Sequence, residues 1–164
     1  MGGRLYGCAF LCLWCILLAF YSDLWYDILV YLCEKGVRAT DGKQIAEKWL
    51  KAFAGDVPRD KLDKYVYDYG NLLWHIFSWE LVECLSEDEA RAAFDALDYK
   101  EALCFRSGYS ADELILTESI RTVPKTYSRE LDSIADVYVT APDFSWTYVH
   151  THEESCGPYF LKIN

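Results

Sequence analysis

The sequence has few basic residues and no basic patch. Only 16 of its 164 residues are lysine or arginine, against 26 aspartates and glutamates, and the formal net charge is -10. Affinity for nucleic acids comes mainly from lysine and arginine side chains that neutralise phosphates, so this balance argues against a nucleic-acid partner. The same negative charge favours the approach of a basic protein through long-range electrostatic steering.

Paired cysteine motifs are also missing from the chain after residue 22. The seven cysteines are an odd number, and those from residue 33 onwards are scattered without a Cys-x-x-Cys pair. A structural zinc site or a disulfide framework would need such spacing. We therefore expect no cofactor, and a reducing, cytoplasmic setting for the globular part of the chain.

Apolar and aromatic side chains, in contrast, are plentiful. Hydrophobic residues make up 52% of the sequence and aromatic residues 16%. That content in a chain of this length is enough for one domain with a hydrophobic core, and it excludes an intrinsically disordered chain.

The first 22 residues differ from the rest. Residues 5–21 carry no charge, whereas residues 23–164 hold all 26 acidic and 15 of the 16 basic residues, for a net charge of -11. We therefore predict two parts, a hydrophobic segment over residues 1–22 and a single α+β globular domain over residues 23–164.

Three interpretations of the hydrophobic segment are open. A run of about 17 residues is the lower limit for crossing a bilayer, so residues 5–21 could anchor the protein to a membrane. A secretory signal is less favoured, because Leu17 would occupy a cleavage position that prefers a small residue. The third interpretation is an upstream-shifted start site. Met1 is the only methionine, and a non-standard initiator now read as Leu24 or Val30 would remove the segment.

Helical periodicity dominates the first half of the domain. The predicted helices cover residues 23–34, 41–54, 58–69 and 86–97. Ser86 and Glu89 fit a capping box at the start of the last of these helices. The apolar run 72–78 has no clean period, and we predict a buried strand there.

After residue 100 the pattern changes to short strands separated by turns. The predicted strands cover residues 102–106, 113–117, 136–140, 144–152 and 159–163. The first two form a hairpin, and the last is a final edge strand. The expected fold class is therefore α+β, with N-terminal helices packed on a mostly antiparallel sheet that is formed largely by the C-terminal half.

Several segments together resemble a known family. These segments are Leu73–Trp79, an acidic helix that ends near Phe94, Asp136–Val139, Phe144–Val149, Thr151–Glu153 and Gly157–Phe160. In order and residue type they are similar to a small bacterial family, the domain of unknown function number 4275, over roughly residues 32–162. The family has no established activity, so the resemblance implies a cytoplasmic bacterial globular domain and leaves the function open.

One candidate site is the region from His150 to Cys156. Histidines two residues apart on a strand point the same way and can reach one ligand. We predict no metal site, because this spacing is unspecific; if one were present, His75, His150 and His152 would be its candidate ligands. Cys156 is also a candidate nucleophile with His152 as its base, although no oxyanion donor is identifiable.

The other candidate is a recognition surface built from aromatic side chains, which are common at interfaces. The candidate binding residues are Trp74, His75, Trp79, Trp146, Tyr148, His152 and Glu153. Strand alternation favours core positions for Trp74 and Trp146, whereas Trp79 and the turn 151–153 are better candidates for exposure.

Two classes of function follow from these features. The preferred one is a non-enzymatic, acidic protein-interaction domain, for instance an immunity-type protein that neutralises a basic protein partner. The alternative is a small metal- or Cys/His-dependent hydrolase that uses the region from His150 to Cys156. The sequence defines neither the catalytic residues of such an enzyme nor the oligomeric state.

Overall fold

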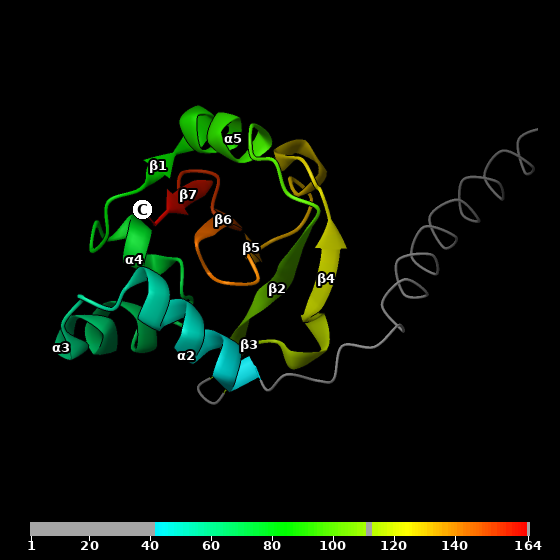
Figure 1. Ribbon diagram of the computed structural model, residues 1–164. Coiled ribbons are helices and arrows are strands. Elements are labelled where there is room, and N and C mark those ends of the chain that lie inside the picture. Colours follow the sequence, from blue (N-terminus) through cyan, green and yellow to red (C-terminus); the bar gives the residue numbers. More distant parts are fainter. Residues whose placement is uncertain (1–41, 111–112, 164) are drawn as a thin grey trace, which may run out of the picture. The chain divides into compact units, whose positions relative to one another are not determined.

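The structure, a computed structural model, describes residues 42–110 and 113–163 (Figure 1). The hydrophobic segment 1–22 and the predicted helix 23–34 lie outside these residues. Within the described ranges, no helix is both long enough and apolar enough to span a bilayer.

Helices occupy the first half of the described chain. They are α2 (Gly42–Phe53), α3 (Arg59–Leu62), which continues into a π-helical turn over Asp63–Tyr67, α4 (His75–Ser78) and α5 (Glu87–Asp95). On α2 the apolar residues recur at helical spacing and are buried along one face, with Ile45 and Trp49 among them. The helices predicted over residues 41–54, 58–69 and 86–97 are therefore confirmed in the described part of the chain.

The strands form one antiparallel sheet. Within the described ranges it has seven strands in the order β1-β7-β6-β5-β2-β3, and β4 also pairs with β2. The strands are β1 (Leu85–Ser86), β2 (Glu101–Ser110), β3 (Glu113–Ile115), β4 (Arg121–Pro124), β5 (Val137–Thr140), β6 (Trp146–His150) and β7 (Tyr159–Lys162). The predicted α+β class, with helices first and an antiparallel sheet mostly from the C-terminal half, is confirmed.

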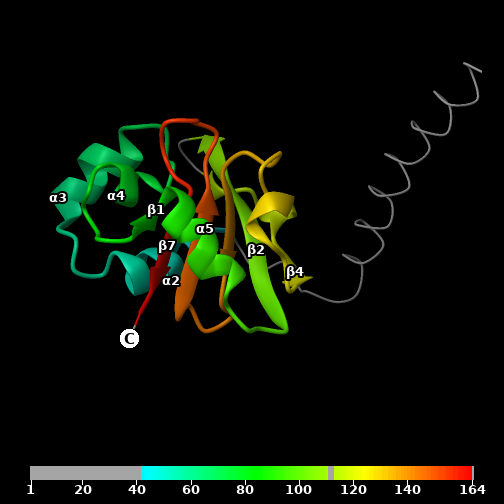
Figure 2. The ribbon, with the colours of Figure 1, turned by 90° about the horizontal axis from the view of Figure 1, so that it is seen from above.

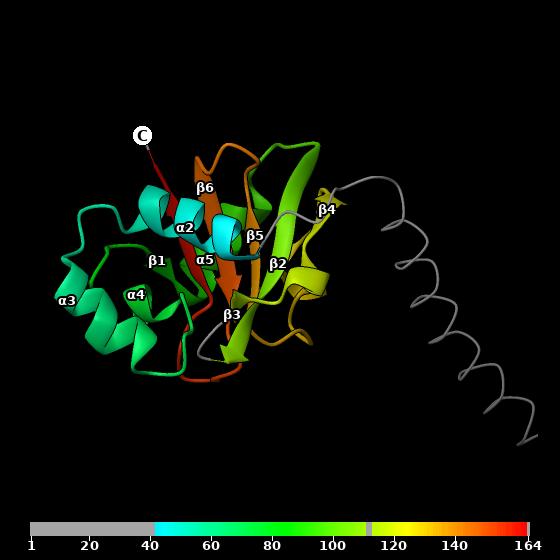
Figure 3. The same ribbon diagram turned by 90° about the horizontal axis from the view of Figure 1, so that it is seen from below.

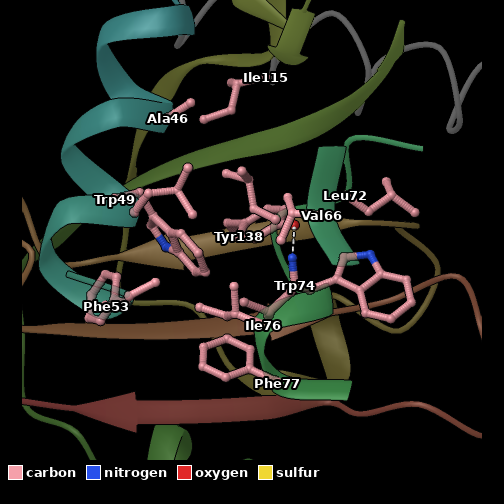
Figure 4. Close-up of a cluster of buried hydrophobic side chains, with 14 of the residues drawn as sticks. Ala46, Trp49, Phe53, Val66, Leu72, Trp74, Ile76, Phe77, Ile115 and Tyr138 are labelled. Atoms are coloured by element: carbon pink, nitrogen blue, oxygen red, sulfur yellow. Dashed lines mark hydrogen bonds between the residues drawn. The ribbon is translucent and has the colours of Figure 1, made fainter. Parts of the chain in front are cut away.

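Helices cover the sheet on both faces. Figures 2 and 3 show α2 and α5 on opposite sides of the strands. On one face, Trp49 of α2 meets the ring of Tyr138 edge-on at 5.5 Å (Figure 4). On the other face, Phe94 of α5 stacks on Tyr148 at 4.2 Å. Successive side chains of a strand point to opposite faces, so each central strand supplies both cores.

The strand predicted over residues 72–78 is wrong. His75–Ser78 is helix α4, and the residues before it form turns. The backbone hydrogen bonds are local, such as that from the Phe77 N–H to the Trp74 carbonyl at 2.9 Å, and the Trp74 N–H donates to the Tyr138 hydroxyl at 2.9 Å (Figure 4). The segment is buried on nearly all sides, which removes the polar positions that would reveal a helical period.

Three smaller expectations are corrected near the sheet edges. The Ser86 side chain caps no backbone N–H at the start of α5, so the predicted capping box is wrong, and the Glu87 N–H donates to the Pro158 carbonyl at 2.9 Å. Strand β1 pairs with Tyr159 and Phe160, the first two residues of β7. Over these residues β7 is therefore not the edge strand of the sheet. Strand β4 was not among the predicted strands; it pairs with β2 and ends at Pro124.

Candidate functional site

A buried carboxylate joins the ends of two neighbouring strands. Asp136 precedes β5 and His152 follows β6, and the antiparallel pairing of Val137 with His150 brings them together. Nδ1 of His152 lies 2.9 and 3.0 Å from the two carboxylate oxygens of Asp136. The Trp74 indole N–H donates to the same carboxylate at 2.9 Å, and the backbone N–H of His152 lies at 3.3 Å from it.

These contacts determine which ring nitrogen of His152 carries a proton. Asp136 is fully buried, and a buried carboxylate is stable only with hydrogen-bond donors around it. An ionised carboxylate only accepts hydrogen bonds, so the ring nitrogen that faces it, Nδ1, carries a proton. The His152 side chain is 38% exposed, and its Nε2 lies 3.8 Å from Oε1 of Glu153.

His152 lines a cavity of about 490 Å³, which we call the histidine cavity. Three carboxylate side chains line it, those of Asp132, Glu153 and Glu154. Its one described guanidinium, that of Arg91, is paired with Asp132 at 2.5 Å. The histidine cavity is therefore negatively charged when its imidazoles are neutral.

A second cavity of about 680 Å³ adjoins the first, and Gly157 lines both. We call it the glutamate cavity, because Glu80, Glu83 and Glu87 line it and no lysine or arginine does so among its described residues. Phe77 contributes an apolar wall. Together the two cavities form what we call the acidic surface, whose described lining has six carboxylates and one guanidinium.

An exposed aromatic cluster precedes Glu80 in the chain. Trp79 is 43% exposed, and its ring lies 5.0 Å from that of Tyr65 and 5.5 Å from that of Tyr69. Tyr69 is itself 57% exposed. Clustered aromatic rings with exposed surface are typical of protein-binding sites.

The three histidines have different hydrogen-bond partners, although the rings of His75 and His152 both contact that of Trp74. His75 is buried against Trp74, with ring centroids 4.3 Å apart, and burial lowers the pKa of its imidazole. Nδ1 of His150 contacts the Ile134 carbonyl at 3.0 Å, whereas His152 is held by Asp136. Among the described residues, no group of three or more histidine, cysteine or acidic side chains is placed to hold a metal ion.

Cys156 lacks the surroundings of an activated nucleophile. Burial and a hydrogen bond with Glu153 raise the pKa of its thiol. A reactive cysteine instead needs a pKa lowered by a nearby positive charge or a helix N-terminus. The Thr151 hydroxyl donates to the Cys156 carbonyl and fixes the turn. The Cys156 thiol is therefore a neutral group in the lining of the histidine cavity.

The candidate binding residues divide into two groups by exposure. Trp74, His75, Trp146 and Tyr148 are buried, whereas Trp79, His152 and Glu153 are exposed. Sequence reasoning missed Asp136 and the three glutamates of the glutamate cavity. The only available signal was the absence of lysine and arginine from residues 65–90, which contain six acidic residues.

The fold is that of a small α+β domain with helices on both faces of an antiparallel sheet. The chain belongs to the DUF4275 family, a domain of unknown function, whose family model matches residues 29–160. The resemblance noted in the sequence is thereby confirmed. No curated protein and no solved structure matches the chain.

Proposed function

We propose that this domain binds a basic protein through its acidic surface. The observation that carries the proposal is the lining of the two adjoining cavities, with six carboxylates against one guanidinium that is already paired. A concave surface of one charge sign raises the local concentration of an oppositely charged partner and accelerates its association.

Apolar contacts would supplement the charges. Trp79 comes directly before Glu80, and large aromatic side chains contribute much of the binding energy of typical interfaces. Val82, which is half-buried, lines the glutamate cavity and offers apolar area to the stems of lysine or arginine side chains. We infer that the partner is a protein with a basic segment, bound in a stoichiometric, immunity-type complex in the cytoplasm.

A charge-matched pair of variants tests this proposal. The probe is an arginine-rich octapeptide, and its affinity for the full chain is measured by calorimetry. The triple substitution Glu80→Gln, Glu83→Gln and Glu87→Gln should weaken binding about tenfold, which corresponds to about 1.4 kcal/mol. The control replaces three exposed acidic residues elsewhere, as Asp98→Asn, Glu101→Gln and Glu118→Gln. Equal losses in both variants would contradict a defined binding surface.

A hydrolase that uses His152 as a general base is the second candidate function. The orientation of its ring by Asp136 favours this candidate, because catalytic histidines are commonly oriented by a carboxylate. The raised pKa of the Cys156 thiol disfavours cysteine as its nucleophile. Hydrolysis of p-nitrophenyl acetate that is lost in His152→Gln and kept in His150→Gln would support the hydrolase, and no hydrolysis above buffer by the wild type would count against it.

A further inference from the structure

Two arginines, Arg106 and Arg121, lie diagonally across neighbouring strands on one face of the sheet. Arg121 of β4 pairs with Cys104 of β2, and Arg106 lies two residues further along β2. Residues two apart on a strand point to the same face, so both arginine side chains leave the sheet on the side of α5, where Cys104 is buried. Such diagonal positions are about 7 to 8 Å apart, so two long side chains can reach one ligand.

The hydrogen-bonding capacity of these two guanidiniums is only partly used within the described part of the chain. Nε of Arg121 is buried and has no hydrogen-bond partner there. Nε of Arg106 donates to the Ala135 carbonyl at 3.0 Å, and neither arginine forms an ion pair with a described carboxylate, whereas Arg59 is paired with Asp63. A buried donor without a partner costs free energy, because it has lost its hydrogen bonds with water. An acceptor supplied by a ligand would remove this cost.

The side chains next to the two arginines on this face are apolar. Cys104 pairs with Arg121 and Val137 of β5 pairs with Arg106, and both partners are buried. Val123 follows on the same face of β4 and is half-buried. Beside such a surface the attraction between a guanidinium and an anion is less weakened by water than it is on an open polar surface. Both arginines are themselves partly exposed, so a ligand can reach them from solvent.

We propose that Arg106 and Arg121 bind a phosphate group. Their two positive charges match the charge of about -1.5 to -2 that a phosphate monoester carries at pH 7. One guanidinium fork satisfies a carboxylate, whereas a tetrahedral phosphate has enough oxygens to accept hydrogen bonds from two forks. Neither arginine lines the acidic surface, so the site goes beyond the proposed function and does not depend on it.

A phosphate titration of the full-length protein, followed by the arginine Nε–H signals in ¹H–¹⁵N spectra, tests this site. Inorganic phosphate and phenyl phosphate are the two probes, because the group occurs both free and as an ester. Acetate at the same ionic strength is the control, since it is an anion with a single charge and a planar carboxylate. Of the two phosphate probes, the one that binds more tightly identifies the ligand as free phosphate or as a phosphate ester.

We expect phosphate to give a saturable shift of the Nε signals of Arg121 and Arg106. The Nε signal of Arg59 should not shift, because this nitrogen already donates to Asp63 at 2.8 Å. Arg121→Gln should weaken phosphate binding about tenfold, since it removes a charge-assisted hydrogen bond. Arg59→Gln removes the same charge from an exposed position and should keep the wild-type affinity. The signal shifts in the wild type do not depend on any variant being folded.

Two kinds of result would overturn the phosphate site. One is a wild-type Arg121 Nε signal that phosphate does not shift in a saturable way, or that acetate shifts equally. The other is an equal loss of phosphate affinity in Arg121→Gln and Arg59→Gln, which would show a general effect of net charge. The octapeptide experiment measures the binding of a cation at other residues, so failure of the phosphate site is distinguishable from failure of the proposed function.

Discussion

The carboxylate of Asp136 and the imidazole of His152 meet at 2.9 Å across the ends of strands β5 and β6. The residues are sixteen positions apart in the chain, and the antiparallel register of the two strands brings them together. Around this pair, Trp74 supplies a further donor from the helical half of the domain. The pair therefore links the core to the histidine cavity.

Asp136→Asn should destabilise the domain by about 2 kcal/mol. Asparagine places an NH2 donor where the carboxylate has its second acceptor oxygen, so this donor opposes the Nδ1 proton of His152, and the charge that strengthens the buried hydrogen bonds is lost. Urea unfolding followed by tryptophan fluorescence measures the loss, with the exposed Asp98→Asn as the control. A free energy of unfolding equal to that of the control would show that the buried contacts contribute nothing.

Stability should fall as the pH falls below about 6.5, the ordinary pKa of histidine. The pKa of His75 is lowered in the folded protein because the ring is buried, so the unfolded chain binds a proton that the folded one does not. Acidification therefore favours unfolding from pH 6.5 down towards the lowered pKa. The free energy of unfolding is measured by urea titration at pH 7.5 and at pH 5.5. It should fall less between these two pH values in His75→Phe than in the wild type. An identical fall in both proteins would show that His75 does not cause the pH dependence.

Trp79→Ala should weaken binding of the basic octapeptide at little cost in stability. The side chain is partly exposed, so truncation removes contact area for the partner without opening a cavity in the core. Tyr127→Ala is the matched control, since Tyr127 is also 43% exposed. Peptide affinities are measured by calorimetry. The same affinity for Trp79→Ala and Tyr127→Ala would show that Trp79 does not contribute to the interface.

The thiols of Cys84 and Cys156 should react slowly with iodoacetamide at pH 7.5. Burial raises the pKa of Cys84 to about 11, and it also raises that of Cys156, so few thiolates are present at neutral pH. Mass spectrometry of Cys84→Ser and Cys156→Ser would give the two rates separately. If Cys156 is alkylated faster than free cysteine, its thiol is activated, and Cys156 is again a candidate nucleophile.

Periodicity was sufficient for the amphipathic elements and failed where burial is complete. Helix α2 has a polar and an apolar face, and its limits were predicted within a residue. The segment around α4 is buried on nearly all sides, so a strand was predicted where a helix forms. Order and spacing along the chain also identified the family.

The candidate site was only partly predictable. The exposed turn with His152 and Glu153 was anticipated from its position after a strand, whereas its partner Asp136 was not. Which distant carboxylate meets a histidine depends on strand register, which a single sequence does not specify here. For the same reason the sequence could not show that residues 80–87 and 153–157 line adjoining cavities.

The most direct test of the acidic surface is to map the bound octapeptide by NMR. Amide signals of the ¹⁵N-labelled full-length protein are followed during titration with the arginine-rich octapeptide. Binding at the acidic surface should give the largest shifts within residues 78–87 and 152–157. Largest shifts around the control carboxylates Asp98, Glu101 and Glu118 instead would contradict the proposed binding surface.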